Sequence, residues 1–147
     1  MGVLVGKKAP SFKASAVVNG GEIVNDFSLD QFIGKNHVLF FFYPKDFTFV
    51  CPSELHAFQA KLKDFNDRGY QVLGASCDTA EVHFAWLNTP KQDGGIEGVE
   101  FPLLSDTTRR LSTELNILDD ESVTYRATYL IDGNGRIFHQ SVNDMPL

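Results

Sequence analysis

The chain has 147 residues, of which 43% are hydrophobic and 22% charged, and this balance is ordinary for a globular protein with one core. Its formal net charge of -6 and its pI near 5.1 leave no basic surface for nucleic acids or anionic membranes. No apolar stretch is long enough to span a bilayer, and the first residues lack the order of a secretory signal peptide. We therefore expect a cytoplasmic protein with a single domain over residues 1–147.

The first half of the chain is predicted to form a hairpin, a helical turn and a central strand. The hairpin turns at Asn19-Gly20, a pair that tolerates the positive φ of a tight turn. The run His-Val-Leu-Phe-Phe-Phe-Tyr is continuously apolar, which is typical of a strand covered on both faces, and Pro44 ends it. The three elements are expected at residues 17–24, 28–34 and 37–43.

After Cys51 the apolar residues change period. Leu55, Phe58, Leu62 and Phe65 are spaced by 3, 4 and 3 positions, so they lie on one face of a helix. Apolar runs and capping residues then predict a strand, two more helices and a closing hairpin. In chain order, the expected ranges are 51–68, 70–76, 81–87, 106–116, and 124–131 paired with 136–142. Parallel strands followed by an antiparallel pair predict an α/β, thioredoxin-like fold, in which helices flank a central mixed β-sheet.

Cys51 lies between the central strand and the helix that follows it. Pro52 fits the first helical position, where its missing N–H costs nothing, so Cys51 is expected at the N-cap. Free backbone N–H groups and the positive end of the helix dipole there lower the pKa of a thiol and favour the thiolate. Thr48 offers a hydroxyl that can bond the sulfur or an oxygen of a substrate. Pro44 offers shape without a donor, which restricts how an electrophile can approach. These residues therefore indicate a nucleophilic thiol.

The pattern Pro44-x-x-x-Thr48-x-x-Cys51-Pro52 resembles the active-site motif of the peroxiredoxins, which are thiol-dependent peroxidases. The flanking residues are similar to the alkyl hydroperoxide reductase C and thiol-specific antioxidant branch, the typical two-cysteine group. Matches to that branch extend over nearly the whole chain, at residues 6–12, 41–44, 50–54, 83–86, 101–106 and 125–132. A chance match over such a span is implausible.

The resemblance implies a reaction and roles for five residues. The Cys51 thiolate attacks the terminal oxygen of hydrogen peroxide or an organic hydroperoxide and becomes a sulfenic acid, which another thiol reduces in the course of antioxidant defence and redox homeostasis. Arg126 matches the arginine that stabilises the thiolate and the peroxide oxygens. Thr48 holds the peroxide in line beside Pro44. Glu54 orients the arginine, although a glutamate in a first helical turn also complements the helix dipole. No cofactor and no metal are implied.

The resemblance departs from the family at the end of the chain. Typical two-cysteine members continue further and carry a resolving cysteine, which attacks the sulfenic acid of a partner subunit. This sequence stops at Leu147 without that segment, and we expect a truncated form. Its turnover is then expected to need an external thiol, from a thioredoxin-like or a flavin-dependent disulfide reductase system.

Other reactive residues have structural explanations. Cys77 follows a predicted strand and could approach Cys51, but it matches no resolving position of the family, so core packing is favoured over a disulfide. The four histidines lack metal-ligand spacing. The loop 94–98 loosely resembles one found in relatives that are sensitive to overoxidation. This loose match does not decide whether the present protein shares that sensitivity. Trp86 and Phe84 are expected in the core or in an interface.

The resemblance also implies an assembly. Residues 136–142 form the last strand, and relatives make a homodimer through that sheet edge. Phe47 and Phe49 belong to the loop that packs dimers of relatives into rings, so a decamer is plausible. A rival interpretation is a non-catalytic thioredoxin-like binding or chaperone module, and a weaker one is a glutathione-peroxidase-like or disulfide-exchange protein. Retention of the catalytic set favours the peroxidase, because a binding module does not need it.

Overall fold

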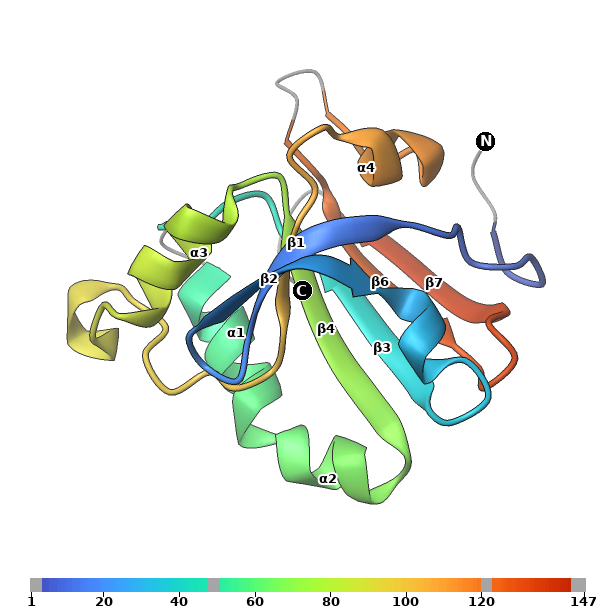
Figure 1. The fold of residues 1–147 in the computed structure, drawn as a ribbon, viewed down its shortest axis with the longest axis horizontal. Coiled ribbons are helices and arrows are strands. Elements are labelled where there is room, and N and C mark those ends of the chain that lie inside the picture. Colours follow the sequence, from blue (N-terminus) through green and yellow to red (C-terminus); the bar gives the residue numbers. More distant parts are fainter. Residues whose placement is uncertain (1–3, 48–50, 120–122, 144–147) are drawn as a thin grey trace.

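The computed structural model of the chain describes residues 4–47, 51–119 and 123–143 (Figure 1). Its centre is a seven-stranded sheet in the order β2-β1-β5-β4-β3-β6-β7. The strands are β1 Lys13–Val18, β2 Glu22–Ser28, β3 His37–Phe42, β4 Tyr70–Ser76, β5 Leu103–Ser105, β6 Arg126–Ile131 and β7 Ile137–Asn143. The helices are α1 Cys51–Ala60, α2 Leu62–Asp67, α3 Ala80–Leu87 and α4 Arg110–Glu114, with 3-10 turns η1 Leu29–Phe32 and η2 Lys91–Asp93.

Strand β3 lies near the middle of the sheet and contributes to both hydrophobic clusters. It pairs in parallel with β4 and antiparallel with β6, so the sheet is mixed as predicted. Phe40 and Phe42 face one cluster, together with η1 and α4. Leu39 and Phe41 face the other, which α1, α2 and α3 cover. The continuous apolar run of β3 is thus explained by burial on both faces.

Two predicted helices differ from those observed. The helix expected after Cys51 is interrupted at Lys61, whose backbone (φ -104°, ψ 4°) leaves helical geometry and whose N–H reaches back only to Phe58, at 3.1 Å. The helix expected from Asp106 begins instead after Arg109, whose φ of 61° is left-handed. The Asp106 carboxylate nevertheless accepts hydrogen bonds from the N–H groups of two residues in the first turn of α4. It therefore caps the helix as predicted, although it lies several residues before the helix begins.

Strand β5 was not expected from the sequence, because three residues carry too little periodicity to be recognised. It pairs antiparallel with β1 and parallel with β4, and so joins the first hairpin to the rest of the sheet. The first hairpin, the strand 70–76, the short helix near 81–87 and the closing hairpin are all confirmed within a few residues.

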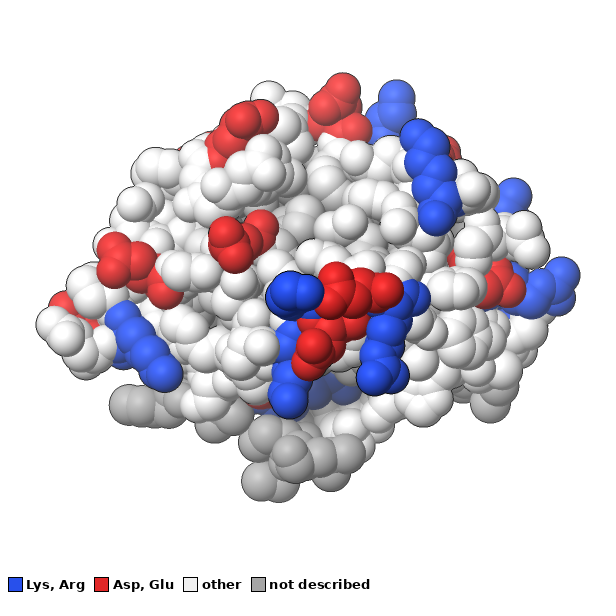
Figure 2. Space-filling view, turned by 90° about the horizontal axis from the view of Figure 1, so that it is seen from below, with Lys and Arg blue, Asp and Glu red and all other residues white. Residues whose placement is uncertain are grey.

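Strand β7 forms one edge of the sheet, as predicted, and is the red strand of Figure 1. Its outer residues include Phe138 and Val142, which are 43% and 41% exposed. On the face shown in Figure 2, acidic and basic side chains lie intermixed. Lys63 and Asp67 of α2 form an ion pair of 2.7 Å. None of the helices in the described ranges is both long and apolar enough to cross a membrane.

The loop after α3 contains a glycine that its neighbours require. A Cβ on Gly95 would overlap the backbone carbonyl of Thr89, which a small rotation of a side chain cannot relieve. We predict that Gly95→Ala lowers the free energy of unfolding by about 2–4 kcal/mol. Urea denaturation measures it, with Gly133→Ala as the control, since a Cβ there meets no atom within 4 Å. Equal stability of the two variants would contradict this packing.

Candidate active site

The loop that connects β3 to α1 carries the predicted nucleophile. Helix α1 begins at Cys51 itself. The sequence predicted a start one position later, with Cys51 as the N-cap and Pro52 as the first helical residue. The first backbone N–H groups of this ten-residue helix lie at its Cys51 end, where the helix dipole is positive. Thr48 and the side chain of Cys51 fall outside the described residues, so their roles stay predictions. Pro44 lies two positions after the end of β3 and is half-buried.

Arg126 and Glu54 meet across the site although 72 positions separate them. Glu54 lies in the first turn of α1, and Arg126 is the first residue of β6. Their side chains form an ion pair. The arginine side chain is 13% exposed and the glutamate side chain 31%. Burial raises the pKa of Glu54, while the guanidinium beside it acts in the opposite direction. The structure therefore brings these two predicted residues together beside the start of α1.

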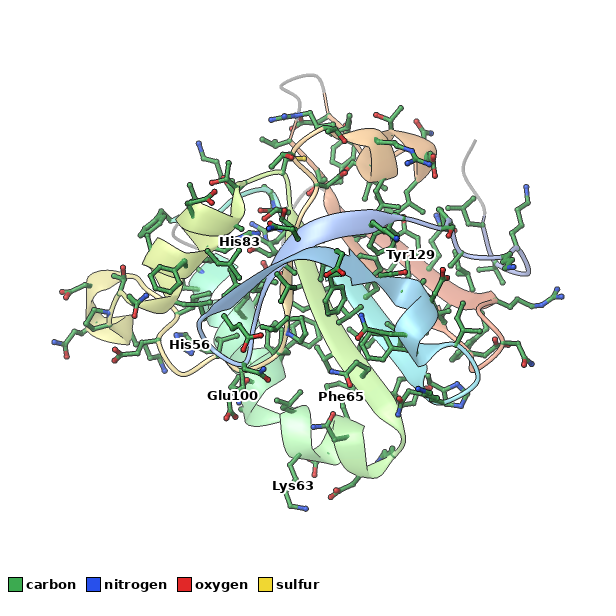
Figure 3. The ribbon with its side chains drawn as sticks, viewed as in Figure 1. His56, Lys63, Phe65, His83, Glu100 and Tyr129 are labelled. Atoms are coloured by element: carbon green, nitrogen blue, oxygen red, sulfur yellow. The ribbon has the colours of Figure 1, made fainter. Side chains whose placement is uncertain are left out.

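A buried network not predicted from the sequence holds the first part of the same loop. The hydroxyl of Tyr43 donates to Asp46 Oδ1 at 2.7 Å, and His83 Nδ1 lies 2.6 Å from Asp46 Oδ2. The other ring nitrogen of His83 lies 2.9 Å from the carbonyl oxygen of Leu104. His83 comes from α3 and is fully buried (Figure 3). Asp46 also donates its backbone N–H to Asp78 at 2.7 Å, so the loop is tied to the sheet and to α3.

The contacts of His83 determine its charge. Both ring nitrogens face acceptors, which favours the doubly protonated imidazolium paired with the Asp46 carboxylate. Burial lowers the pKa of His83, but the hydrogen bond and charge of Asp46 outweigh it, so the net shift is upward. Sequence signals for this pair were available: Asp46 lies inside the motif, and His83 lies in one of the matched segments.

Polar side chains on the outer part of α1 bind the loop 94–100. His56 Nε2 lies 3.1 Å from the carbonyl oxygen of Gly95. Gln59 makes two bonds of 2.8 Å with Glu100, one to its side chain and one to its backbone N–H. His56 and Glu100 are labelled in Figure 3. Helix α1 is therefore fixed by this loop as well as by Arg126 and by its apolar face.

Cys77 is buried and free, as expected for a packing residue. Its sulfur lies 3.9 Å from the hydroxyl oxygen of Ser112, which also bonds the Asp106 carboxylate. Burial raises the pKa of the Cys77 thiol, so it is a poorer nucleophile than an ordinary cysteine. Trp86 is likewise in the core and donates its indole N–H to Gly94 O at 2.9 Å, whereas Phe84 is exposed. Within the described ranges, no three His, Cys, Asp or Glu residues are grouped to hold a metal.

Comparisons with known proteins agree with this architecture. The model of the AhpC/TSA family matches residues 5–140. The chain is 47% identical over 145 residues to alkyl hydroperoxide reductase C of Helicobacter pylori strain J99, covering 99% of this chain and 73% of that protein. It is 46% identical over 144 residues to peroxiredoxin-2 of Pongo abelii, covering 97% and 80%. The solved structure of reduced Plasmodium vivax 2-Cys peroxiredoxin superposes with a TM-score of 0.92 at 48% identity, covering 96% and 72%.

The fold is the thioredoxin-like fold of the peroxiredoxins, with a mixed sheet flanked by helices. The chain belongs to the AhpC/TSA family and to its typical two-cysteine branch. It is an enzyme, a thiol-dependent peroxidase that uses a peroxide substrate and a thiol reductant.

The pKa of His83 gives the network a pH dependence. Because this pKa is raised in the folded state above its ordinary value of 6.5, the stabilisation is complete below that value and is lost as pH rises through the folded pKa. We predict that wild type exceeds His83→Gln in unfolding free energy by about 3 kcal/mol near pH 6, and that the difference shrinks toward pH 9.

Urea denaturation over this pH range measures the difference. His139→Gln is the matched control, because that histidine is exposed on β7. A gap between wild type and His83→Gln that is the same at every pH would show that the pair does not contribute as an ion pair.

Proposed function

We propose that Cys51 is the peroxidatic nucleophile of this enzyme. The observation that carries the proposal is the ion pair of Arg126 with Glu54, which places a guanidinium beside the first turn of the helix that begins at Cys51. A thiolate at this position is stabilised by the helix N-terminus and by a cation that never loses its proton at neutral pH. Cys77, in contrast, is buried and its thiol pKa is raised.

In the proposed reaction the Cys51 thiolate attacks the terminal oxygen of hydrogen peroxide or an organic hydroperoxide. A sulfur–oxygen bond forms as the oxygen–oxygen bond breaks, and the electron pair of the broken bond leaves with the distal oxygen. That oxygen takes a proton from solvent and departs as water or an alcohol, while Cys51 becomes a sulfenic acid. A second thiol then attacks the sulfenic acid and releases water.

Four further residues assist this step in our proposal. Arg126 stabilises the negative charge as it moves to the leaving oxygen. Glu54 holds the guanidinium in place through the ion pair. Thr48 keeps the peroxide in line, and Pro44 shields the thiolate from water, because its ring carries no donor. In a non-catalytic binding module the same ion pair would serve only to fix α1.

The reductant, assembly and location of the enzyme are also proposed. We expect an external thiol, supplied by a thioredoxin-like protein or a flavin-dependent disulfide reductase system. The exposed Phe138 on edge strand β7 supports a homodimer through that edge. Phe47 lies in the active-site loop, is 52% exposed and supports the packing of dimers into a decamer. The protein acts as one domain in the cytoplasm.

The assignment of Cys51 is tested by stopped-flow measurement of hydrogen peroxide consumption. We predict that the reduced wild-type protein consumes one equivalent rapidly, and that Cys51→Ser slows the reaction by at least about 10³-fold, because the nucleophile is lost. Cys77→Ser serves as the control and should react like wild type. Equal, slow rates for wild type and Cys51→Ser would refute the assignment.

The ion pair predicts unequal effects for its two members. Arg126→Gln should lower the rate constant with peroxide by about 10²-fold, since a charge near the reacting oxygens disappears. Glu54→Gln should lower it only several-fold, because the guanidinium stays and loses just one of its restraints. The same stopped-flow assay compares them. A larger loss for Glu54→Gln than for Arg126→Gln would reverse the roles assigned to these residues.

A further inference from the structure

Thr124 lies outside the motif residues, yet it makes a buried contact with the active-site loop. Its hydroxyl donates a 2.8 Å hydrogen bond to the carbonyl oxygen of Tyr43, which is 81 positions away in the sequence. Thr124 is 1% exposed, so water does not compete for this bond. We propose that Thr124 is a positioning residue for the reaction with peroxide, which it serves by orienting Pro44 relative to Arg126. The proposal rests on the roles proposed above for Cys51, Pro44 and Arg126.

The accepting carbonyl belongs to the peptide unit that joins Tyr43 to Pro44. A peptide unit is planar, so fixing its oxygen also fixes the plane from which the proline ring extends. Proline has no N–H, and this unit can therefore be held by a hydrogen bond only through its carbonyl. The N–H of Tyr43 belongs to the preceding unit and bonds Ala75 of β4 at 3.0 Å. The Thr124 hydroxyl thus restrains the Tyr43–Pro44 peptide unit, whereas the bond to β4 restrains the peptide unit before it.

The position of Thr124 is itself well determined. It forms a backbone bridge with Leu118, and the next residue, Tyr125, donates its N–H to Ile117 O at 2.7 Å. The ladder between β3 and β6 ends with the pair Phe42 and Ala127, so Thr124 extends the connection between the two segments beyond the last pair. The restraint therefore comes from a fixed backbone rather than from a free loop.

Arg126 follows Thr124 by two positions. In an extended segment, residues two apart point to the same side, so the hydroxyl and the guanidinium project together toward the active-site loop and α1. Thr124 reaches the peptide unit of Pro44, while Arg126 reaches Glu54 in the first turn of α1. The short segment from Thr124 to Arg126 thereby sets the spacing between Pro44 and the Arg126 guanidinium.

The test separates positioning from simple packing. Thr124→Val keeps the shape and removes the hydroxyl, Thr124→Ser keeps the hydroxyl, and Thr113→Val removes an exposed hydroxyl bond of similar type to Arg109 O. For each variant, stopped-flow measures the rate constants with hydrogen peroxide and with iodoacetamide. Alkylation by iodoacetamide requires the Cys51 thiolate but not the alignment of a peroxide. The ratio of the two rate constants therefore reports the alignment.

We expect Thr124→Val to lower the ratio of the peroxide to the iodoacetamide rate constant by about tenfold, because small displacements of reacting groups are costly. Thr124→Ser should restore most of the ratio, and Thr113→Val should leave it unchanged. If Thr124→Val fails to fold by circular dichroism, Thr124→Ala provides the same comparison with a smaller side chain.

An unchanged ratio in the folded Thr124→Val or Thr124→Ala variant would overturn the positioning role, even if its thermal stability falls. A ratio that Thr124→Ser fails to restore would overturn it as well. Failure of the assignment of Cys51 looks different: wild type and Cys51→Ser then react alike with peroxide, before any Thr124 variant is considered.

Discussion

The hydrogen bonds of the Asp46 carboxylate are the constraint on which the active-site loop depends. Strand β3 is buried on both faces, but the chain must leave the sheet after Tyr43 to reach α1. A buried carboxylate inside such a loop is costly unless it is paired. Tyr43, directly after β3, and His83 of α3 supply its partners. The cost of burying these charges thus favours one conformation of the first part of the loop, residues 43–46.

Helix α1 is restrained from several directions at once. Its apolar residues pack into the cluster shared with α2 and α3, and Phe58 stacks on Phe41 with ring centroids 4.2 Å apart. The ion pair of Glu54 with Arg126 and the bonds from His56 and Gln59 to the loop 94–100 fix the helix about its own axis. The dipole of a short helix is useful for stabilising a thiolate only if its direction is constant. These contacts supply that constancy.

Much of the fold could be predicted because its signals are local. A few adjacent residues determine each of three features: the apolar run that forms β3, the turn at Asn19-Gly20, and the turn between β6 and β7. Strand β5 was missed because its pairing with β1 and β4 arises from the tertiary fold. The interruption at Lys61 was missed because the apolar spacing continues across it. Periodicity records which face is buried, and it does not record small changes of helical geometry.

The site residues also fall into those with a local sequence signal and those whose contacts arise only in the folded chain. Pro44 and Cys51 could be proposed from the motif, and Arg126 from the wider resemblance to the family. The structure pairs Arg126 with Glu54, while the catalytic roles of these residues stay predictions. The pairing of Asp46 with His83 joins residues 37 positions apart and could not be derived from spacing. A buried polar residue shows no amphipathic pattern, so only the folded structure, or a comparison with relatives, reveals its partner.

The interruption at Lys61 has a consequence for the motion of the site. Helix formation is cooperative along a continuous segment, so fraying that starts at one end spreads until the regular geometry is broken. With α1 ending at Ala60 and α2 beginning at Leu62, the first helix is a separate cooperative unit of ten residues. Its Cys51 end can loosen while α2 stays packed on β4. Opening of the first turn of α1, which ends before the buried Leu55, would therefore leave α2 and the core in place.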